Sequence, residues 1–369
     1  MYILNLPQKI CFGVGGLQSL PEYLTGQSRI FLLSCGRKNR EKLFSTLFTL
    51  LENFHVTHEI LSGEEPTLEL TDKFLAAARK TRPDVVIAVG GGAVIDAAKT
   101  VAILLSLPGS TADYFYNRRK LSQCGTKLIC IPTTAGTGAE VTANAVLSDP
   151  ATNIKQSLRH PSMQPTVAIV DPELTLSCPP SITAASGMDS LTQAIESLIA
   201  QKANHFTKPL SRQAAELVYK NLPAVIADGN NLPARTALSE GTLLGAMAFA
   251  HSGLGAVHGL AHPIGCLRHI PHGVVCAKLL PEILQWNYTV SSGELEKLAV
   301  QLGEKDFAAL HQNLLKFNQD FGINDRFRSA GLTREDFPFI IAHSRSGSMK
   351  ANPRDLSDND LYTILESLL

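Results

Sequence analysis

Apolar and polar positions follow two different patterns along this chain. In the first half, short apolar runs with strand character recur, and segments with helical spacing such as 38–53 and 67–81 lie between them. The apolar runs cover 29–34, 84–89, 127–131 and 166–170. Strands that alternate with helices form βαβ units around a mainly parallel sheet. The first half is therefore predicted to be an α/β domain.

The pattern changes after about residue 177. Consecutive prolines, Pro179 and Pro180, mark the change, since they disfavour a helix and set a rigid connection. Beyond them, helical spacing dominates over 183–202, 206–228, 233–252 and 273–288. We therefore predict an α/β domain over 1–177, followed by an all-helical domain over 178–369.

Composition narrows the classes of protein that fit. The 369 residues are 44% hydrophobic, and 33 basic residues balance 33 acidic ones. No basic excess indicates a nucleic acid or a membrane surface as partner, and no apolar stretch approaches the ~18 residues of a membrane span. No signal peptide is visible at the start of the chain. Seven cysteines without a CxxC pair predict a reducing compartment, so we expect a cytoplasmic protein.

A glycine triplet follows the apolar run 84–89. Gly90, Gly91 and Gly92 lead directly into a helical pattern that carries Asp96. Glycines let a phosphate approach the backbone, and the free N–H groups and dipole of a helix N-terminus favour negative charge. The spacing is not GxGxxG, and a plain tight turn would also explain the triplet.

A second polar loop strengthens the case for an anion site. Thr133, Thr134 and Thr137 follow the run 127–131, together with two glycines. Open α/β sheets bind ligands at the carboxyl ends of their strands. The two loops together therefore predict a nucleotide-binding edge.

Histidines are crowded in the second half. Five of the eleven lie between His251 and His272. His258 and His262 are four residues apart and share a helix face, and neutral imidazole is the commonest metal ligand. The alternative is a group of hydrogen-bonded core histidines. Cys266, four residues beyond His262, is interpreted as a buried thiol. Upstream, Asp189 and Gln193 are also four residues apart on an otherwise apolar helix.

Four motifs in order, GGGAVIDAAK, IPTTAGTGAE, GMDSLTQAIE and HGLAHPIG…PHG, resemble those of the iron-containing (group III) alcohol dehydrogenases. The resemblance implies the two-domain architecture shared with dehydroquinate synthase. It implies a divalent metal, Fe²⁺ or Zn²⁺, on Asp189, His258 and His272, with His262 near the nicotinamide as the proton-transfer residue. For the dinucleotide it implies Gly90, Gly91, Gly92, Thr133 and Thr134, with Lys155 near the cofactor. Asp96 and Thr137, from the same two loops, are further candidates for the dinucleotide.

Two departures from the family pattern change the expectations. Gln193 stands where the family has a histidine ligand, and an amide oxygen is a poorer ligand than imidazole; we expect weaker metal retention, with Gln193 as a candidate fourth ligand. After the run corresponding to 29–34, NAD-preferring members of the family have an aspartate that accepts a hydrogen bond from the 2′-OH of the adenosine ribose. This chain has no acid there and has Arg37, Lys38 and Arg40 instead. Arg37 is a candidate for a 2′-phosphate, so NADP is favoured over NAD.

The expected activity is hydride transfer between NAD(P)H and a small alcohol or carbonyl compound, with a homodimer as the expected assembly. Loss of the histidine ligand leaves open a metal-free enzyme similar to maleylacetate reductases. A lyase similar to dehydroquinate synthase needs a basic cluster for a substrate phosphate, and the helical half has only scattered Lys and Arg. A non-enzymatic binding module would not require both a dinucleotide loop and a metal constellation.

Overall fold

The computed structural model describes residues 3–25, 28–36, 38, 40–61, 65–123, 126–323 and 327–369. Within it the chain divides into two compact units. Unit 1 comprises Met1–Cys178 and Gly229–Ser239, and unit 2 comprises Pro179–Asp228 and Glu240–Leu369. The sequence-based boundary at 177 did not anticipate that the segment 229–239 groups with unit 1.

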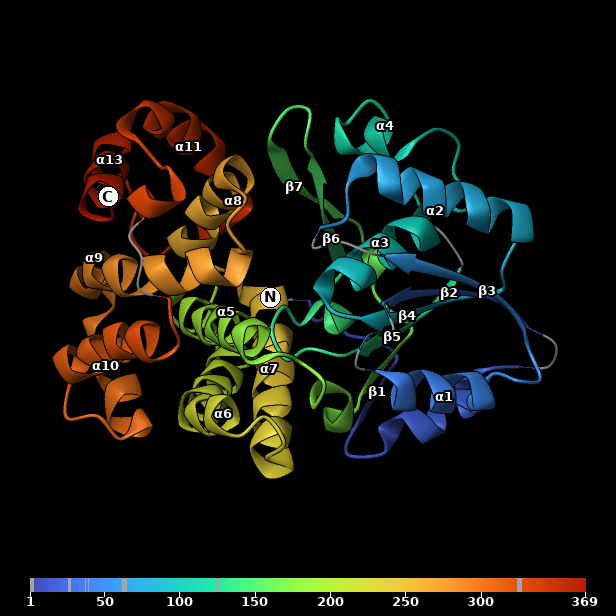
Figure 1. The fold of residues 1–369 in the computed structure, drawn as a ribbon. Helices are drawn as coiled ribbons and strands as arrows, with labels where there is room; N and C mark the ends of the chain where they lie inside the picture. Colours follow the sequence, from blue (N-terminus) through green and yellow to red (C-terminus); the bar gives the residue numbers. More distant parts are fainter. Residues whose placement is uncertain are drawn as a thin grey trace. The chain divides into compact units, whose positions relative to one another are not determined.

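Unit 1 is built on a six-stranded parallel sheet with the strand order β1-β8-β5-β4-β2-β3 (Figure 1). Its strands are β1 (Lys9–Phe12), β2 (Arg29–Cys35), β3 (His55–Leu61), β4 (Val85–Gly90), β5 (Lys127–Pro132) and β8 (Val167–Val170). Its helices are α1 (Glu41–Leu50), α2 (Leu68–Thr81), α3 (Gly92–Leu104) and α4 (Thr111–Phe115). A separate antiparallel hairpin is formed by β6 (Asn144–Asp149) and β7 (Ile154–Arg159).

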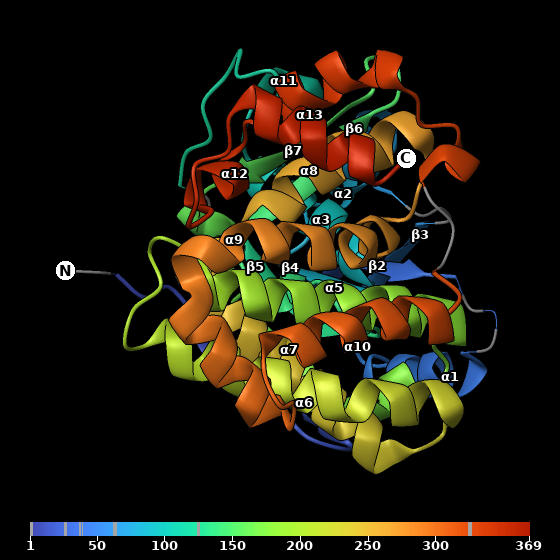
Figure 2. The same ribbon diagram turned by 90° about the vertical axis from the view of Figure 1, so that its left-hand side faces the viewer.

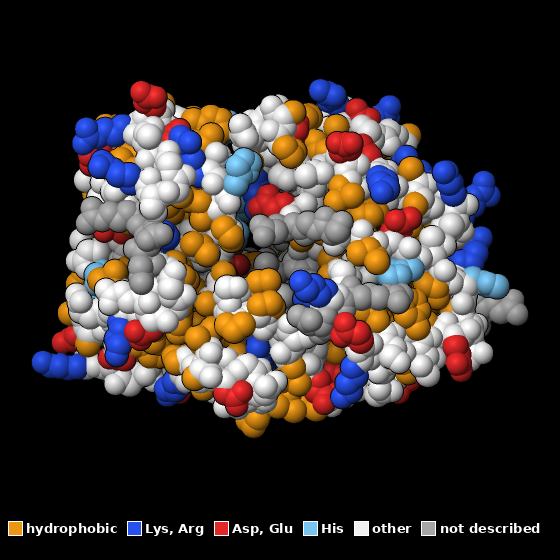
Figure 3. All heavy atoms as spheres, in the orientation of Figure 1, with side chains coloured by type: hydrophobic (Ala, Val, Ile, Leu, Met, Phe, Trp, Pro, Cys, Tyr) orange, Lys and Arg blue, Asp and Glu red, His pale blue; other side chains and the backbone are white. Residues whose placement is uncertain are grey.

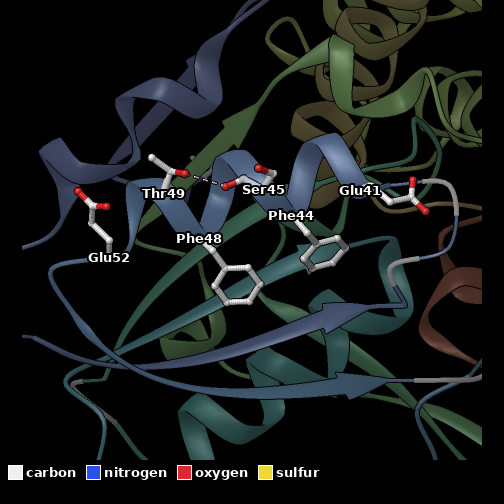
Figure 4. Close-up of a pocket in the computed structure, with 6 residues that line it drawn as sticks. All are labelled: Glu41, Phe44, Ser45, Phe48, Thr49 and Glu52. Atoms are coloured by element: carbon white, nitrogen blue, oxygen red, sulfur yellow. Dashed lines mark hydrogen bonds between the residues drawn. The ribbon is translucent and has the colours of Figure 1, made fainter.

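Helices cover both faces of this sheet, which explains the continuous apolar runs of its central strands. Phe31 and Leu33 of β2 pack with α2 and α3 on one face. Ile30 and Leu32 pack with α1 on the other. In the close-up of α1, the rings of Phe44 and Phe48 point from the helix toward the strands, whereas Glu41 and Glu52 lie at the two ends of the groove that these residues line (Figure 4).

Unit 2 is helical within the described residues. Its helices are α5 (Pro180–Ile199), α6 (Thr207–Ala227), α7 (Leu232–Ser252, whose first part belongs to unit 1), α8 (Ala256–Arg268), α9 (His272–Leu302), α10 (Phe307–Asp320), α11 (Phe337–Ser344), α12 (Gly347–Ala351) and α13 (Asp358–Ser367). Figures 1 and 2 show α5 between α9 and α6, and α5 packs on both. The predicted parallel α/β sheet followed by a helical half is confirmed.

Nearly every side chain of α5 beyond Thr183 is buried, the polar ones included. Buried polar groups need hydrogen-bond partners. Ser190 bonds with Thr242 of α7 at 2.9 Å, and Ser197 bonds with Ser211 at 2.8 Å. The buried acids of the same helix lie among histidines, which leads to the site below.

Among the described residues, no single helix is long and apolar enough to cross a membrane, and only the bent pair α7 and α8 meets the criteria of length and composition when taken together.

Candidate metal and dinucleotide sites

Asp189 of α5, His258 of α8 and His272 at the start of α9 meet inside unit 2. Asp189 Oδ1 lies 3.2 Å from His258 Nε2 and 3.9 Å from His272 Nε2. The rings of His258 and His272 have centroids 5.4 Å apart. Cys276, one turn after His272, joins them, and one ligand atom from each of the four lies within 4.8 Å of the others. A carboxylate, two imidazoles and a thiol are suitable donors for a divalent transition metal.

Glu196 holds His258 in place from the opposite side. Its Oε2 lies 2.6 Å from His258 Nδ1, and its Oε1 accepts from the backbone N–H of Val257 at 2.7 Å. A carboxylate on the second ring nitrogen of a ligating histidine fixes its tautomer and orientation. Gly255 makes room for this carboxylate, because a Cβ there would lie 2.6 Å from Glu196 Oε1.

The electrostatics of the pocket favour a cation. Burial alone would lower the pKa of His258, but its hydrogen bonds to Asp189 and Glu196, and their charges, outweigh burial and raise the pKa to about 10. Two buried carboxylates around one imidazole thus stabilise positive charge at this point. Either a proton on His258 or a metal ion supplies that charge.

Gln193 lies beside Asp189 and presents its amide group to it. The amide Nε2 donates to Asp189 Oδ2 at 3.0 Å. The oxygen of Asp189 that faces the histidines is the other one, Oδ1. Gln193 therefore orients the carboxylate in this structure.

The remaining clustered histidines divide into two groups. His262 is partly exposed, and its ring stacks on that of His272 with centroids 5.0 Å apart. His251 bonds with the carbonyl of Met247 at 2.7 Å, and His269 ends α8 with a left-handed backbone. Three of the five histidines thus gather at one place, and the other two have local roles.

The glycine and threonine loops lie together in unit 1. The backbone N–H of Thr133 donates to the carbonyl of Gly90 at 3.0 Å. Cβ atoms at Gly91 and Gly92 would lie 3.3 Å from Thr134 Oγ1 and 2.7 Å from Thr137 Oγ1 respectively. Gly91 is the N-cap of α3, whose first turn carries no acid and no side-chain cap. This helix N-terminus can receive an anion between the two loops.

Three other residues predicted for the dinucleotide have different surroundings. Asp96 accepts from the backbone N–H of Val146 at 3.1 Å, and Lys155 forms an ion pair with Glu65. Arg37 lies outside the described residues.

Sequence reasoning did not assign roles to Glu196 or Cys276. Glu196 is seven residues after Asp189, two turns along the same helix face, and Cys276 is four residues after His272. These spacings were available signals, but only the packing of α5, α8 and α9 shows that the faces meet.

The comparisons with known families and known proteins agree with one another. Residues 7–172 match the model for "Iron-containing alcohol dehydrogenase", and residues 183–369 match the C-terminal model of the Fe-containing alcohol dehydrogenase family. An NADPH-dependent butanol dehydrogenase from Clostridium saccharobutylicum is 32% identical over 99% of this chain and 97% of its own. A 1,3-propanediol dehydrogenase from Citrobacter freundii is 33% identical over 99% of this chain and 98% of its own.

Solved structures agree as well. A 1,3-propanediol oxidoreductase superposes with a TM-score of 0.90 at 29% identity, with complete coverage of both chains. A sulfoacetaldehyde reductase from Bifidobacterium kashiwanohense in complex with NAD+ gives a TM-score of 0.91 at 28% identity, covering 100% of this chain and 98% of the other. The chain therefore belongs to the iron-containing alcohol dehydrogenase family and is an oxidoreductase acting on CH–OH groups.

Proposed function

We propose that this protein is a metal-dependent, NAD(P)-linked alcohol dehydrogenase or aldehyde reductase acting on small alcohols and carbonyl compounds. The observation that carries the proposal is the convergence of Asp189, His258 and His272, from three helices, in a pocket whose charges favour a cation. A buried group of this kind requires partners that compensate its charges. A bound divalent metal is such a partner.

Each residue of the pocket has a defined task in this proposal. Asp189, His258 and His272 hold the metal, which supplies Lewis-acid chemistry to a substrate oxygen. Glu196 keeps the Nε2 atom of His258 directed at the site, and Gln193 keeps one oxygen of Asp189 directed there. His262 is partly exposed beside His272, where it can pass the alcohol proton to solvent.

The dinucleotide is proposed to bind on unit 1. The N-terminus of α3 and the backbone of Gly90, Gly91 and Gly92 would receive the pyrophosphate, with Thr133, Thr134 and Thr137 alongside. Asp96 and Lys155 remain candidates for contacts with the dinucleotide, although in this structure each has a partner within the protein. The nicotinamide supplies the hydride chemistry, and the protein supplies position and field.

We propose a preference for NADPH over NADH. The segment after β2 offers Arg37, Lys38 and Arg40 where an acid would repel a 2′-phosphate, and the butanol dehydrogenase relative is NADPH-dependent. One charge-assisted hydrogen bond is worth about 1.5–3 kcal/mol, roughly 10–100-fold in affinity. Replacing Arg37 and Arg40 together by Ser should erase the preference in cofactor titrations while leaving NADH binding nearly unchanged. Equal dissociation constants in the unaltered protein would contradict the proposal.

Metal analysis of protein prepared without oxygen, combined with a panel of aldehydes and both cofactors, tests the main proposal. We expect close to one metal per chain, loss of turnover with a chelator, and loss of both metal and turnover in Asp189→Ala and His258→Ala. Activity at under one metal per ten chains, insensitive to chelators, would instead favour the metal-free, maleylacetate reductase-like enzyme that Gln193 leaves open.

The remaining proposals concern surroundings and partners. We propose a cytoplasmic location, supported by seven cysteines without a CxxC pair.

We propose that the partners are small molecules. Acidic and basic side chains are interspersed over the described surface of the face in Figure 3, so this face shows no extended basic patch that would suit a nucleic acid. A homodimer is supported by the edge position of β1 and by the exposed apolar side chains Ile3, Leu4 and Val14, which flank β1 in the sequence. Analytical ultracentrifugation tests it.

A further inference from the structure

Cys276 is a potential metal donor that the family resemblance does not assign. It is buried on α9, and its Sγ lies 3.6 Å from His272 Nε2. His272 and Cys276 are four residues apart on one helix face, so the helix presents both to the same place. The thiol is thus fixed at the pocket by the same element as the second histidine.

The separations between the four donor atoms fit one coordination sphere. The measured ones are 3.2 Å for Asp189 Oδ1 to His258 Nε2, 3.9 Å for Asp189 Oδ1 to His272 Nε2, and 3.6 Å for His272 Nε2 to Cys276 Sγ. All others are within 4.8 Å. A tetrahedral zinc ion with bonds of about 2.0–2.3 Å separates its ligand atoms by about 3.3–3.8 Å. The observed set needs only small side-chain adjustments to reach that geometry.

Gln193, in contrast, directs an N–H group toward Asp189, and an N–H group has no lone pair to offer a metal. Its Nε2–H group is directed at Asp189 Oδ2. It supports the carboxylate from outside the group of four. The position where the family has a histidine ligand, Gln193, therefore supplies no ligand atom, whereas Cys276 brings a thiol to the same pocket from α9.

We infer that Cys276 Sγ is the fourth protein ligand of the metal, so that the site is Asp189, His258, His272 and Cys276. This inference rests on the proposed metal site. On binding, the S–H bond of Cys276 breaks, its electron pair forms the metal–sulfur bond and its proton passes to solvent. A thiolate is a soft ligand, so this site selects Zn²⁺ over Fe²⁺ more strongly than an oxygen and nitrogen set would. With four protein ligands, a substrate oxygen would have to enter as a fifth ligand, as some catalytic zinc sites allow when they expand to five-coordinate.

Zinc K-edge X-ray absorption on the full-length protein, stripped with a chelator and reloaded with one equivalent of Zn²⁺, tests the inference. The unaltered protein should show one sulfur at about 2.3 Å beside nitrogen and oxygen at about 2.0–2.2 Å. Cys276→Ser should lose the sulfur shell and bind zinc at least roughly 10-fold more weakly, because even a second-shell change costs that much. Cys266→Ser, a buried cysteine of the same unit, is the matched control and should keep both.

The outcomes separate this inference from the proposed function. One zinc per chain with only nitrogen and oxygen neighbours overturns the role of Cys276 and leaves the metal site intact. No retained Zn²⁺ in the unaltered protein overturns the role of Cys276, and the proposed metal site fails as well if Fe²⁺ added without oxygen is not retained either. The spectrum of the unaltered protein decides the question even if Cys276→Ser does not fold.

Discussion

His262 lies beside the cluster of metal donors and is not one of the four donors. Its ring stacks on His272, yet the side chain is partly exposed, whereas His258 is 3% exposed. A residue that shuttles protons needs access to solvent, and a ligand does not. His262→Ala should therefore keep the metal and lower turnover by roughly 10²–10⁴-fold, the usual contribution of general acid–base catalysis. Metal content and kcat measured on one preparation check this, and loss of metal would place His262 among the ligands.

The buried carboxyl of Glu140 in unit 1 should make the stability of the fold depend on pH. Burial raises the pKa of this carboxyl to about 6 from its ordinary 4.5, against the lowering effect of its own backbone N–H and of Lys99. The raised pKa means that the folded state favours the protonated carboxyl over the ionised one. The contribution of protonated Glu140 to the unfolding free energy is complete below pH 4.5 and is lost as the pH rises through 6.

The Glu140→Gln variant cannot titrate at this position. Relative to it, the unaltered protein should lose up to about 2 kcal/mol of unfolding free energy as the pH rises from below 4.5 to above 6. Denaturant unfolding of both proteins across this range is the measurement. Parallel stability curves would show that Glu140 is solvated in solution.

The sequence identified the site best where a residue type carries the chemistry. The sequence was enough to identify Asp189, His258 and His272, because acids and histidines are rare on apolar helices and because their motifs match the family. It was not enough to identify Glu196 and Cys276, since a glutamate and a cysteine on a helix have many ordinary explanations. Their meaning depends on which helix faces meet.

At the level of elements, the turn from β4 into α3 depends on Gly90. A Cβ there would lie 2.6 Å from Cγ2 of the buried Val94. Overpacking of this kind costs about 1–3 kcal/mol. Gly90→Ala should lower the unfolding free energy by that amount and weaken dinucleotide binding, because the helix N-terminus must shift.

Gly293 of α9 provides the control for this prediction. It is exposed, and a Cβ there would contact nothing within 4 Å. Gly293→Ala should raise stability by about 0.5–1 kcal/mol, since alanine loses less backbone entropy in a helix. Equal effects of the two substitutions in chemical denaturation would contradict the packing argument.

The predicted strands 29–34, 84–89, 127–131 and 166–170 correspond to β2, β4, β5 and β8, and these are confirmed. They are the four central strands of the sheet, and most of their positions are buried and apolar. The edge strands β1 and β3 and the hairpin β6–β7 were not predicted. They are partly exposed and mix polar with apolar residues, so hydrophobic periodicity carries little signal there.

At the level of the molecule, each unit is proposed to carry one ligand site, and each ligand should stabilise its own unit. The metal donors come from α5, α8 and α9, with Asp189 and His258 separated by 69 residues along the chain. A ligand that binds only the folded state at 100 times its dissociation constant stabilises by about 2.7 kcal/mol. For a domain of this size that corresponds to about 5–11 °C in melting temperature.

Hydrogen exchange and calorimetry on the stripped full-length protein check this prediction. Zn²⁺ should raise the melting temperature and slow exchange in α5, α8 and the start of α9, because the metal ties these helices together. NADPH should instead slow exchange at the N-terminus of α3 and in the loop of Thr133 and Thr134. Asp189→Ala should abolish the response to Zn²⁺ and keep the response to NADPH, since the two sites belong to different units. A zinc response of equal size in Asp189→Ala would show that the metal binds elsewhere on the chain.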